Sequence, residues 1–305
     1  MTHRLNLFLL CLAVAVALPY YWLVLHNPSR NLAPEPVHMA DLRRLADGLP
    51  GPRPASVTVT LVGWDRTPGT LLAAGAGLKR RMYSVVSFRL DVPGQGPIVI
   101  DTGTTAPLAR KEGVEGFRPL RQQQLYSDMR AASHIVPTDE SPETLAGLAA
   151  LAQASNSAMA LTRARLNPAQ LPAATRAAGL PWPDRLTLGA AVRPGPPQVI
   201  APGVVVIPTA APTPGSQMVY AHLADGREYL FAGPVAPYPV NFLDLRTRSN
   251  LLDLLEGHQD RVGAMRWLIT LRQWQKEAPR LYVVPGHDLM ALTDKDAPSG
   301  IVYRE

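Results

Sequence analysis

Short runs of apolar and β-branched residues recur along this chain of 305 residues, and most of them end in a polar loop. Such runs predict strands, and the shortest, wholly apolar ones predict strands buried on both faces. The predicted strands are Ser56–Val62, Arg81–Val92, Ile98–Ile100, His134–Val136, Gln198–Ile200, Gly203–Ile207, Met218–Leu223, Glu228–Phe231 and Leu281–Val284, with a weaker one at Arg185–Leu188.

Apolar residues at helical spacing separate these strands. Met265, Leu268, Leu271 and Trp274 form one apolar stripe, which is typical of an amphipathic helix packed on a core. Helices are predicted at Arg118–Ser133, Leu145–Ala154 and Arg261–Lys276, with helical or irregular inserts at Asn156–Ala164 and Pro168–Ala178. The hairpin turn at Asp225-Gly226 implies antiparallel pairing. The order therefore predicts an α+β fold, an αββα sandwich of two mixed sheets with outer helices, rather than a doubly wound parallel sheet.

The N-terminal segment is apolar and uncharged over Leu5–Leu25, which is long enough to span a bilayer as a helix. Small residues within it also offer cleavage patterns for a signal peptide, but the apolar run continues too far for a short signal sequence. We favour an uncleaved signal-anchor over residues 1–26, a Pro-rich tether over 27–54 and a folded domain over 55–305. A short tail before one span predicts that the domain is periplasmic or otherwise extracytoplasmic.

The composition and the absence of certain motifs argue against several classes of function. The net charge is +6, but the basic residues are scattered and no stripe interleaved with aromatic residues is present, so we expect no nucleic-acid partner. A single cysteine, Cys11, excludes a disulfide within the chain and a thiolate metal site. No glycine-rich phosphate loop supports a nucleotide site.

Candidate chemistry gathers where strands end. Asp139 and Glu143 lie in the stretch Ile135–Leu148, between a strand and a helix, where they form either an acidic helix cap with Ser141 or Thr144 or a catalytic carboxylate cluster. Asp101 follows Ile98–Ile100 and is expected to brace loop N–H groups. His287 and Asp288 follow the last strand.

Four landmarks, in order, resemble the metallo-β-lactamase fold hydrolases, in particular their lactonase-like members. They are IVIDTG at Ile98–Gly103, the loop Thr138–Leu148, the segment Val204–Gln217 with the hairpin and Gly233 after it, and LYVVPGHD at Leu281–Asp288. The resemblance covers about residues 56–305 and implies the αββα fold and a dinuclear zinc site.

The residues that would bind zinc are mostly replaced. In the first loop Asp139 and Ser141 stand for two of the family's histidines, Glu143 for its aspartate and Thr144 for its last histidine. Pro212 and Pro234 stand at two further ligand positions, and His287 alone is kept. A hydrolytic zinc site needs about three protein ligands, and proline offers no side-chain donor. We therefore predict no zinc cofactor and no zinc hydrolase activity.

Three hypotheses remain. The first is a membrane-tethered, degenerate member of the fold that binds an unknown small ligand or a protein partner. The second is a lactone or ester hydrolase with a rearranged site, in which Asp139, Glu143 and His287 are the catalytic candidates. That site could instead hold one harder cation, with ligands drawn from Asp101, Asp139, Glu143, His287 and Asp288. The third is another exported α/β module, which a wide separation of Asp101, Asp139 and His287 would favour.

Overall fold

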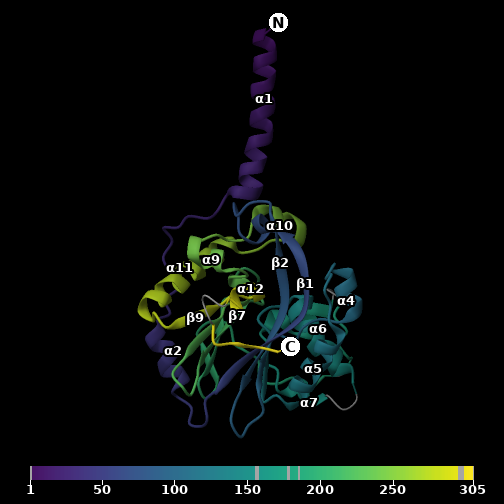
Figure 1. The fold of residues 1–305 in the computed structure, drawn as a ribbon, viewed down its shortest axis with the longest axis vertical. Coiled ribbons are helices and arrows are strands. Elements are labelled where there is room, and N and C mark those ends of the chain that lie inside the picture. Colours follow the sequence, from purple (N-terminus) through teal and green to yellow (C-terminus); the bar gives the residue numbers. More distant parts are fainter. Residues whose placement is uncertain (1, 155–157, 177–178, 185, 295–298, 305) are drawn as a thin grey trace.

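Two five-stranded sheets form the centre of the molecule (Figure 1). A computed structural model describes residues 2–154, 158–176, 179–184, 186–294 and 299–304. The first sheet has the order β10-β1-β2-β3-β4 and the second the order β5-β6-β7-β8-β9. Their bounds are β1 (Ser56–Pro68), β2 (Arg80–Asp91), β3 (Ile98–Ile100), β4 (His134–Val136), β5 (Gln198–Ala201), β6 (Val204–Pro208), β7 (Gln217–His222), β8 (Glu228–Phe231), β9 (Leu281–Val284) and β10 (Val302–Tyr303).

Both sheets are mixed, as the sequence predicts. Strands β1, β2 and β3 pair antiparallel, while β4 pairs parallel to β3 and β10 parallel to β1. In the second sheet β5 to β8 pair antiparallel in sequence order, and β9 pairs parallel to β8. Each parallel strand arrives after a helix, because a parallel connection needs a crossover too long for a hairpin.

Helices cover both outer faces, so the layers are αββα. Helices α5 (Pro119–Ala131) and α6 (Pro142–Gln153) pack on the first sheet, and α2 (Met39–Ala46) and α11 (Arg261–Glu277) pack on the second. The core between the sheets holds apolar side chains from both inner faces, for example Phe88 against Phe231 at 4.9 Å between ring centroids. Shorter helices close the ends: α3 (Gly69–Leu72), α4 (Ala106–Lys111), α9 (Pro239–Asp244), α10 (Asn250–Glu256) and α12 (Leu289–Leu292).

Some local predictions differ from the structure. Strand β1 continues to Pro68, and the two-residue strand β10 was not predicted. Of the strand predicted at Arg185–Leu188, residue 185 lies outside the described residues and 186–188 form no strand. Helix α6 begins at Pro142 rather than Leu145, because proline fits the first turn of a helix, where its missing N–H costs nothing.

The Pro-rich segment is more tightly integrated than a tether. Met39, Leu42 and Ala46 on α2 are almost completely buried in the core beside α11. Arg43 of the same helix donates from Nε and Nη2 to the Glu228 carboxylate at 2.8 and 2.6 Å. Part of the segment 27–54 therefore belongs to the folded domain.

The N-terminal helix projects from one end of the domain. It comprises α1 (Thr2–Tyr20) and a π-helical turn, η1 (Tyr21–Leu25). The segment His3–Leu25 is long and apolar enough to cross a membrane, and its side chains are exposed over most of its length. Length and composition alone are also satisfied by a signal sequence, so the helix is consistent with either prediction for the N-terminus.

Candidate functional site

Asp101 is held at the end of β3 as a brace between loops. Its Oδ1 accepts the Thr138 backbone N–H at 2.6 Å and its Oδ2 accepts the Thr138 hydroxyl at 3.1 Å. The residue adopts a left-handed backbone conformation with φ of 60°, which Asp tolerates better than most residues. The expectation that Asp101 braces loop N–H groups is confirmed, with the bracing directed at the β4 loop.

Asp139 organises the start of α6. Its Oδ1 accepts from the Ser141 N–H at 3.0 Å, from the Ser141 hydroxyl at 2.6 Å and from the Thr144 hydroxyl at 2.5 Å. Ser141 is the N-cap residue, but its hydroxyl donates to Asp139 and caps no helix N–H. The predicted Ser141 cap is therefore wrong in its details, since the carboxylate two residues earlier takes the hydrogen bonds of this turn.

Glu143 and His287 are joined through a tyrosine that the sequence did not single out. The Tyr83 hydroxyl on β2 lies 3.0 Å from Glu143 Oε1 and 2.9 Å from His287 Nε2. The Tyr83 and His287 rings also stack at 4.0 Å between centroids. His287 Nδ1 lies 3.1 Å from the Ser84 carbonyl oxygen, and the side chain is buried.

These contacts limit the positions that the protons can take. The Ser84 carbonyl can only accept, so His287 Nδ1 carries a hydrogen. If the imidazole is neutral, its Nε2 is an acceptor, and the single Tyr83 hydrogen satisfies either Nε2 or the Glu143 carboxylate. Both contacts are satisfied only when one further proton is present, on Glu143 or on His287. Glu143, Tyr83 and His287 therefore form a hydrogen-bonded chain that retains a proton.

Burial decides which end holds that proton. Removal from water, followed by the charge of Asp139, raises the pKa of Glu143 to about 7. Burial lowers the pKa of His287 to about 4, although Asp139 opposes that shift. Below about pH 7 and above about pH 4 the chain is thus a protonated carboxyl, a phenol and a neutral imidazole. Burial, with Asp139 next, also raises the pKa of Asp101 to about 8.

A cation faces the same cluster from the loop before α10. Burial raises the pKa of Tyr83 and lowers that of His287. The positive charge of Arg248 opposes the first shift and adds to the second. Arg248 Nε is buried and has no hydrogen-bond partner among the residues that the structure describes. The sequence offered no signal for Arg248, which lies in an irregular loop far from every landmark.

The structure brings most of the predicted residues together. Asp139 acts electrostatically on Asp101, Glu143 and His287, so these four residues form one group, which we term the carboxylate–histidine cluster. This proximity argues against an unrelated α/β module. Asp288 has a different role, because its Oδ1 accepts the Ala291 N–H at 3.2 Å as the N-cap of α12.

The donors of the cluster do not fit a dinuclear zinc site. Asp101 uses both carboxylate oxygens, Asp139 its Oδ1 and His287 both ring nitrogens in hydrogen bonds within the protein. Pro212 and Pro234 offer no side-chain donor. Within the described ranges, no three His, Cys, Asp or Glu side chains are placed to hold a metal ion. One imidazole with carboxylates is also a poor ligand set for zinc.

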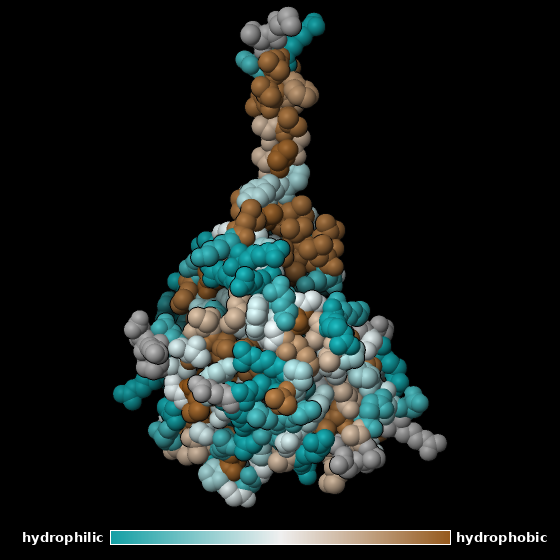
Figure 2. Space-filling model, turned by 45° about the vertical axis from the view of Figure 1, so that its right-hand side comes forward, coloured by the Kyte–Doolittle hydropathy of each residue, from teal (hydrophilic) through white to brown (hydrophobic). Residues whose placement is uncertain are grey.

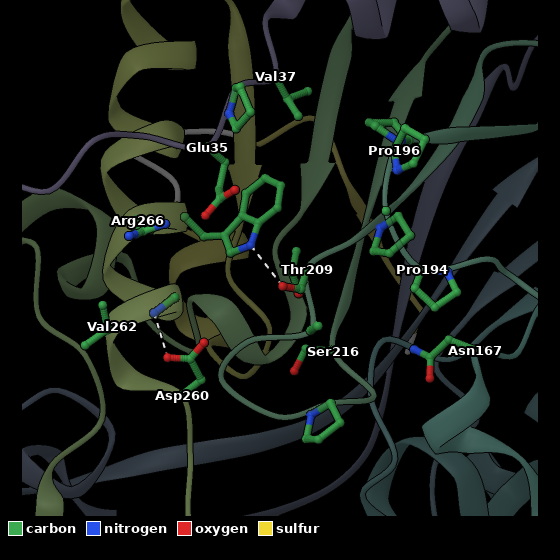
Figure 3. A pocket seen from close by; sticks show the side chains of 18 of the residues that line it. Glu35, Val37, Asn167, Pro194, Pro196, Thr209, Ser216, Asp260, Val262 and Arg266 are labelled. Atoms are coloured by element: carbon green, nitrogen blue, oxygen red, sulfur yellow. Dashed lines mark hydrogen bonds between the residues drawn. The ribbon is translucent and has the colours of Figure 1, made fainter.

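A cavity of about 820 Å³ lies beside the cluster rather than over it. Figure 3 shows Arg266 and Val262 of α11 on one side of this cavity and Pro194 and Pro196 on the other, and Trp267 of α11 also lines it. Trp267 Nε1 donates to the Thr209 carbonyl at 3.1 Å. The loop between β6 and β7 lines this cavity. Thr213 in the same loop donates at 2.8 Å to the carboxylate of Glu140, the residue next to Asp139 of the cluster.

Solved structures share this architecture. An N-acyl homoserine lactone hydrolase with N-hexanoyl-L-homoserine at its catalytic metal center is 13% identical, with a TM-score of 0.58 over 78% of this chain and 95% of that one. A quorum-quenching N-acyl homoserine lactone lactonase is 14% identical, with a TM-score of 0.59 over 79% and 95%. A probable metal-dependent hydrolase from Staphylococcus aureus is 11% identical, with a TM-score of 0.57 over 78% and 91%.

No family model matches the sequence, and no curated protein does. The structural likeness nevertheless shows the fold: the two mixed sheets with their outer helices form a metallo-β-lactamase-like α+β fold, which is shared with these lactonases over 78% and 79% of this chain, as the four landmarks predict. At these identities the likeness extends to the fold and not to the chemistry.

Proposed function

We propose that this chain is a membrane-anchored protein of the metallo-β-lactamase fold that lacks a dinuclear zinc site and binds a ligand or partner. The observation that carries the proposal is the internal hydrogen bonding of the carboxylate–histidine cluster. Releasing these side chains for a metal would break the bonds of Asp139 and of the Glu143–Tyr83–His287 chain. Each buried polar group left unpaired costs about 1–3 kcal/mol.

Turnover of the relatives' substrate class tests the lost activity. The purified chain, supplied with zinc, is incubated with N-hexanoyl-L-homoserine lactone, and ring opening is followed by chromatography. We expect no opening above the rate in buffer. Ring opening that a chelator abolishes would refute the proposal.

We place a small ligand in the cavity beside the cluster. Its volume is in the range of small-molecule sites, about 300–1,000 Å³. The lining is largely apolar, with Glu35, Asp260 and Arg266 as charged groups, which suits an amphiphilic organic molecule. Its polar ends would meet these side chains while its apolar part lies against Trp267.

A cavity-filling variant tests this placement. Val262→Trp puts an indole into the cavity from an exposed position on α11, and Val302→Trp adds the same group at an exposed position on β10. A fragment library is screened by saturation-transfer NMR against all three chains. Fragments that bind the wild type and Val302→Trp but not Val262→Trp support the assignment, whereas identical binding to all three chains contradicts it.

A second function, hydrolysis without metal, is favoured by the Glu143–Tyr83–His287 chain. A protonated carboxyl linked to a neutral imidazole can give a proton at one end and take one at the other, which is the requirement of general acid–base catalysis. Hydrolysis of a p-nitrophenyl ester is the assay. Turnover that falls in both Glu143→Gln and His287→Asn supports this function, and undetectable or unchanged turnover eliminates it.

The anchor and its orientation are also part of the proposal. Mass spectrometry of the mature chain shows whether residues 1–26 remain, and alkaline extraction shows whether the chain stays in the membrane. If the domain is extracytoplasmic, protease added to spheroplasts with an intact inner membrane digests it. A cleaved chain found in the soluble fraction would contradict the anchor.

A further inference from the structure

The base of the projecting helix is fixed to the domain by several hydrogen bonds. The Val24 carbonyl accepts from the Thr70 hydroxyl at 3.0 Å and from the Gly75 N–H at 2.9 Å. The Trp22 carbonyl accepts from the Asn250 amide of α10 at 2.7 Å. Val24 itself is buried against the domain. The helix and the domain are therefore joined without a free linker.

This attachment determines where a bilayer must lie. The hydrocarbon core is about 30 Å thick and needs about 20 helical residues at about 1.5 Å each. The apolar run Leu5–Leu25 supplies 21 residues, so nearly its whole length is needed to cross. The membrane surface then lies at η1, where Tyr21 and Trp22 are exposed, as aromatic residues at an interface commonly are. The end of the domain beside η1 must consequently touch the lipid.

The side chains at that end suit such contact. Leu254 and Leu255 of α10 are 72% and 65% exposed, and Leu78, in the loop that holds Val24, is 65% exposed. Figure 2 shows apolar surface gathered on the domain beside the base of the helix. At 3.6 residues per turn Leu254 and Leu255 share one side of α10, whereas Asp253 and Glu256 lie on the other.

Positive charge follows directly after the exposed Leu78. Lys79, Arg80 and Arg81 are all exposed at the start of β2. Basic side chains next to apolar ones at a membrane surface attract anionic headgroups, by about 1 kcal/mol for each cation. Exposed leucines that gather in one patch, as these do beside the base of the helix, are typical of a surface that binds a protein or a membrane.

We infer that α10 and the segment 77–81, which leads into β2, form a lipid-binding face, on which the domain lies flat against the bilayer. This inference rests on the proposed membrane anchor. The partner is the bilayer interface itself, with leucines among the acyl chains and cations at anionic headgroups. The carboxylate–histidine cluster lies close to this face, because Arg248, two residues before α10, acts on His287 by its charge and Glu256 of α10 acts on Glu143.

Site-directed spin labelling of the full chain in nanodiscs tests the inference. The discs contain phosphatidylcholine with phosphatidylglycerol, and the native Cys11 in α1 is labelled first. In a Cys11→Ser background, labels are then placed at Leu254→Cys and Leu255→Cys on α10. The matched control is Leu120→Cys, an equally exposed leucine on α5, which lies away from α1 in Figure 1. Accessibility to oxygen is compared with accessibility to a water-soluble nickel chelate.

We expect the labels on α10 to give an oxygen-to-nickel ratio close to that of Cys11, and the Leu120 label to give the ratio of an aqueous site. If Cys11 is in lipid while the α10 labels match Leu120, the lipid-binding face is refuted and the anchor stands. If Cys11 is itself accessible to the nickel chelate, the anchor fails, and with it the basis of the inference.

Discussion

Replacing Glu143 by Gln removes one titrating proton from the Glu143–Tyr83–His287 chain while keeping its shape. The amide can donate to the Tyr83 oxygen as the protonated carboxyl does, and Tyr83 can still donate to His287 Nε2. The folded state raises the pKa of Glu143 from 4.5 to about 7, mainly by burial. The folded protein therefore binds this proton more tightly than the unfolded chain does, and stability falls as the pH rises between these values.

The magnitude follows from the pKa shift. The difference between a pKa of 4.5 and one of about 7 corresponds to about 3 kcal/mol of stability, which is present below about pH 4.5 and lost above about pH 7. Glu143→Gln lacks this loss. Relative to the wild type we expect it to gain about 3 kcal/mol in the free energy of unfolding between pH 4.5 and pH 7. Asp101 and His287 titrate in both proteins. The raised pKa of Asp101 makes stability fall as the pH rises, whereas the lowered pKa of His287 makes stability rise with pH below about pH 6.5. Because both effects are common to the wild type and the variant, the difference between them isolates Glu143.

Urea unfolding of the full chain in detergent micelles, followed by the fluorescence of the buried Trp267 and Trp274, measures these free energies. The groups that face Glu143 are Tyr83, Asp139 and Glu256, and all are retained in the variant. A variant that becomes less stable than the wild type above about pH 7 would refute the reasoning, because it would show an ionised Glu143 paired with a protonated His287.

Two further predictions concern the supports of the site. Arg43→Ala leaves the buried Glu228 carboxylate without its main partner. We expect the free energy of unfolding to fall by about 2 kcal/mol, which is below the range for fully buried pairs because Arg43 is 40% exposed. An unchanged urea midpoint would show that α2 is a loose tether. Asp101→Ala removes both hydrogen bonds to Thr138, and we expect it to lower the free energy of unfolding by about 2 kcal/mol. Asp101→Asn keeps an acceptor for the Thr138 N–H, so its loss should be smaller. Equal losses in the two variants would contradict a bracing role.

Much of the fold could be predicted from the sequence because its strands are short, apolar and bounded by turn residues. Ile98–Ile100, Glu228–Phe231 and Leu281–Val284 have the predicted bounds, since a wholly buried strand leaves little room for a shift in its ends. Strand β10 escaped prediction because two residues carry no periodicity. Helix α2 was overlooked as part of the core because the many prolines around it suggested a semi-rigid tether.

The candidate site was less predictable than the fold. Asp101, Asp139 and His287 were found because they follow strand ends, and Glu143 because it lies at the helix start after one of them, where side chains converge. Tyr83 was missed because it lies inside a strand, and strand tyrosines are usually packing residues. Its role depends on which way β2 turns it, and that is set by the pairing of β2 with its neighbours rather than by local sequence.

Equilibrium zinc binding is the most direct test of the central claim, that the fold has been kept while its metal site has been lost. The purified full chain is dialysed against buffered zinc, freed of excess metal and analysed by mass spectrometry of the element. The account predicts that no zinc is retained in stoichiometric amount, since both oxygens of Asp101, Oδ1 of Asp139 and both ring nitrogens of His287 are engaged in hydrogen bonds within the protein. Two tightly held zinc ions per chain would contradict it.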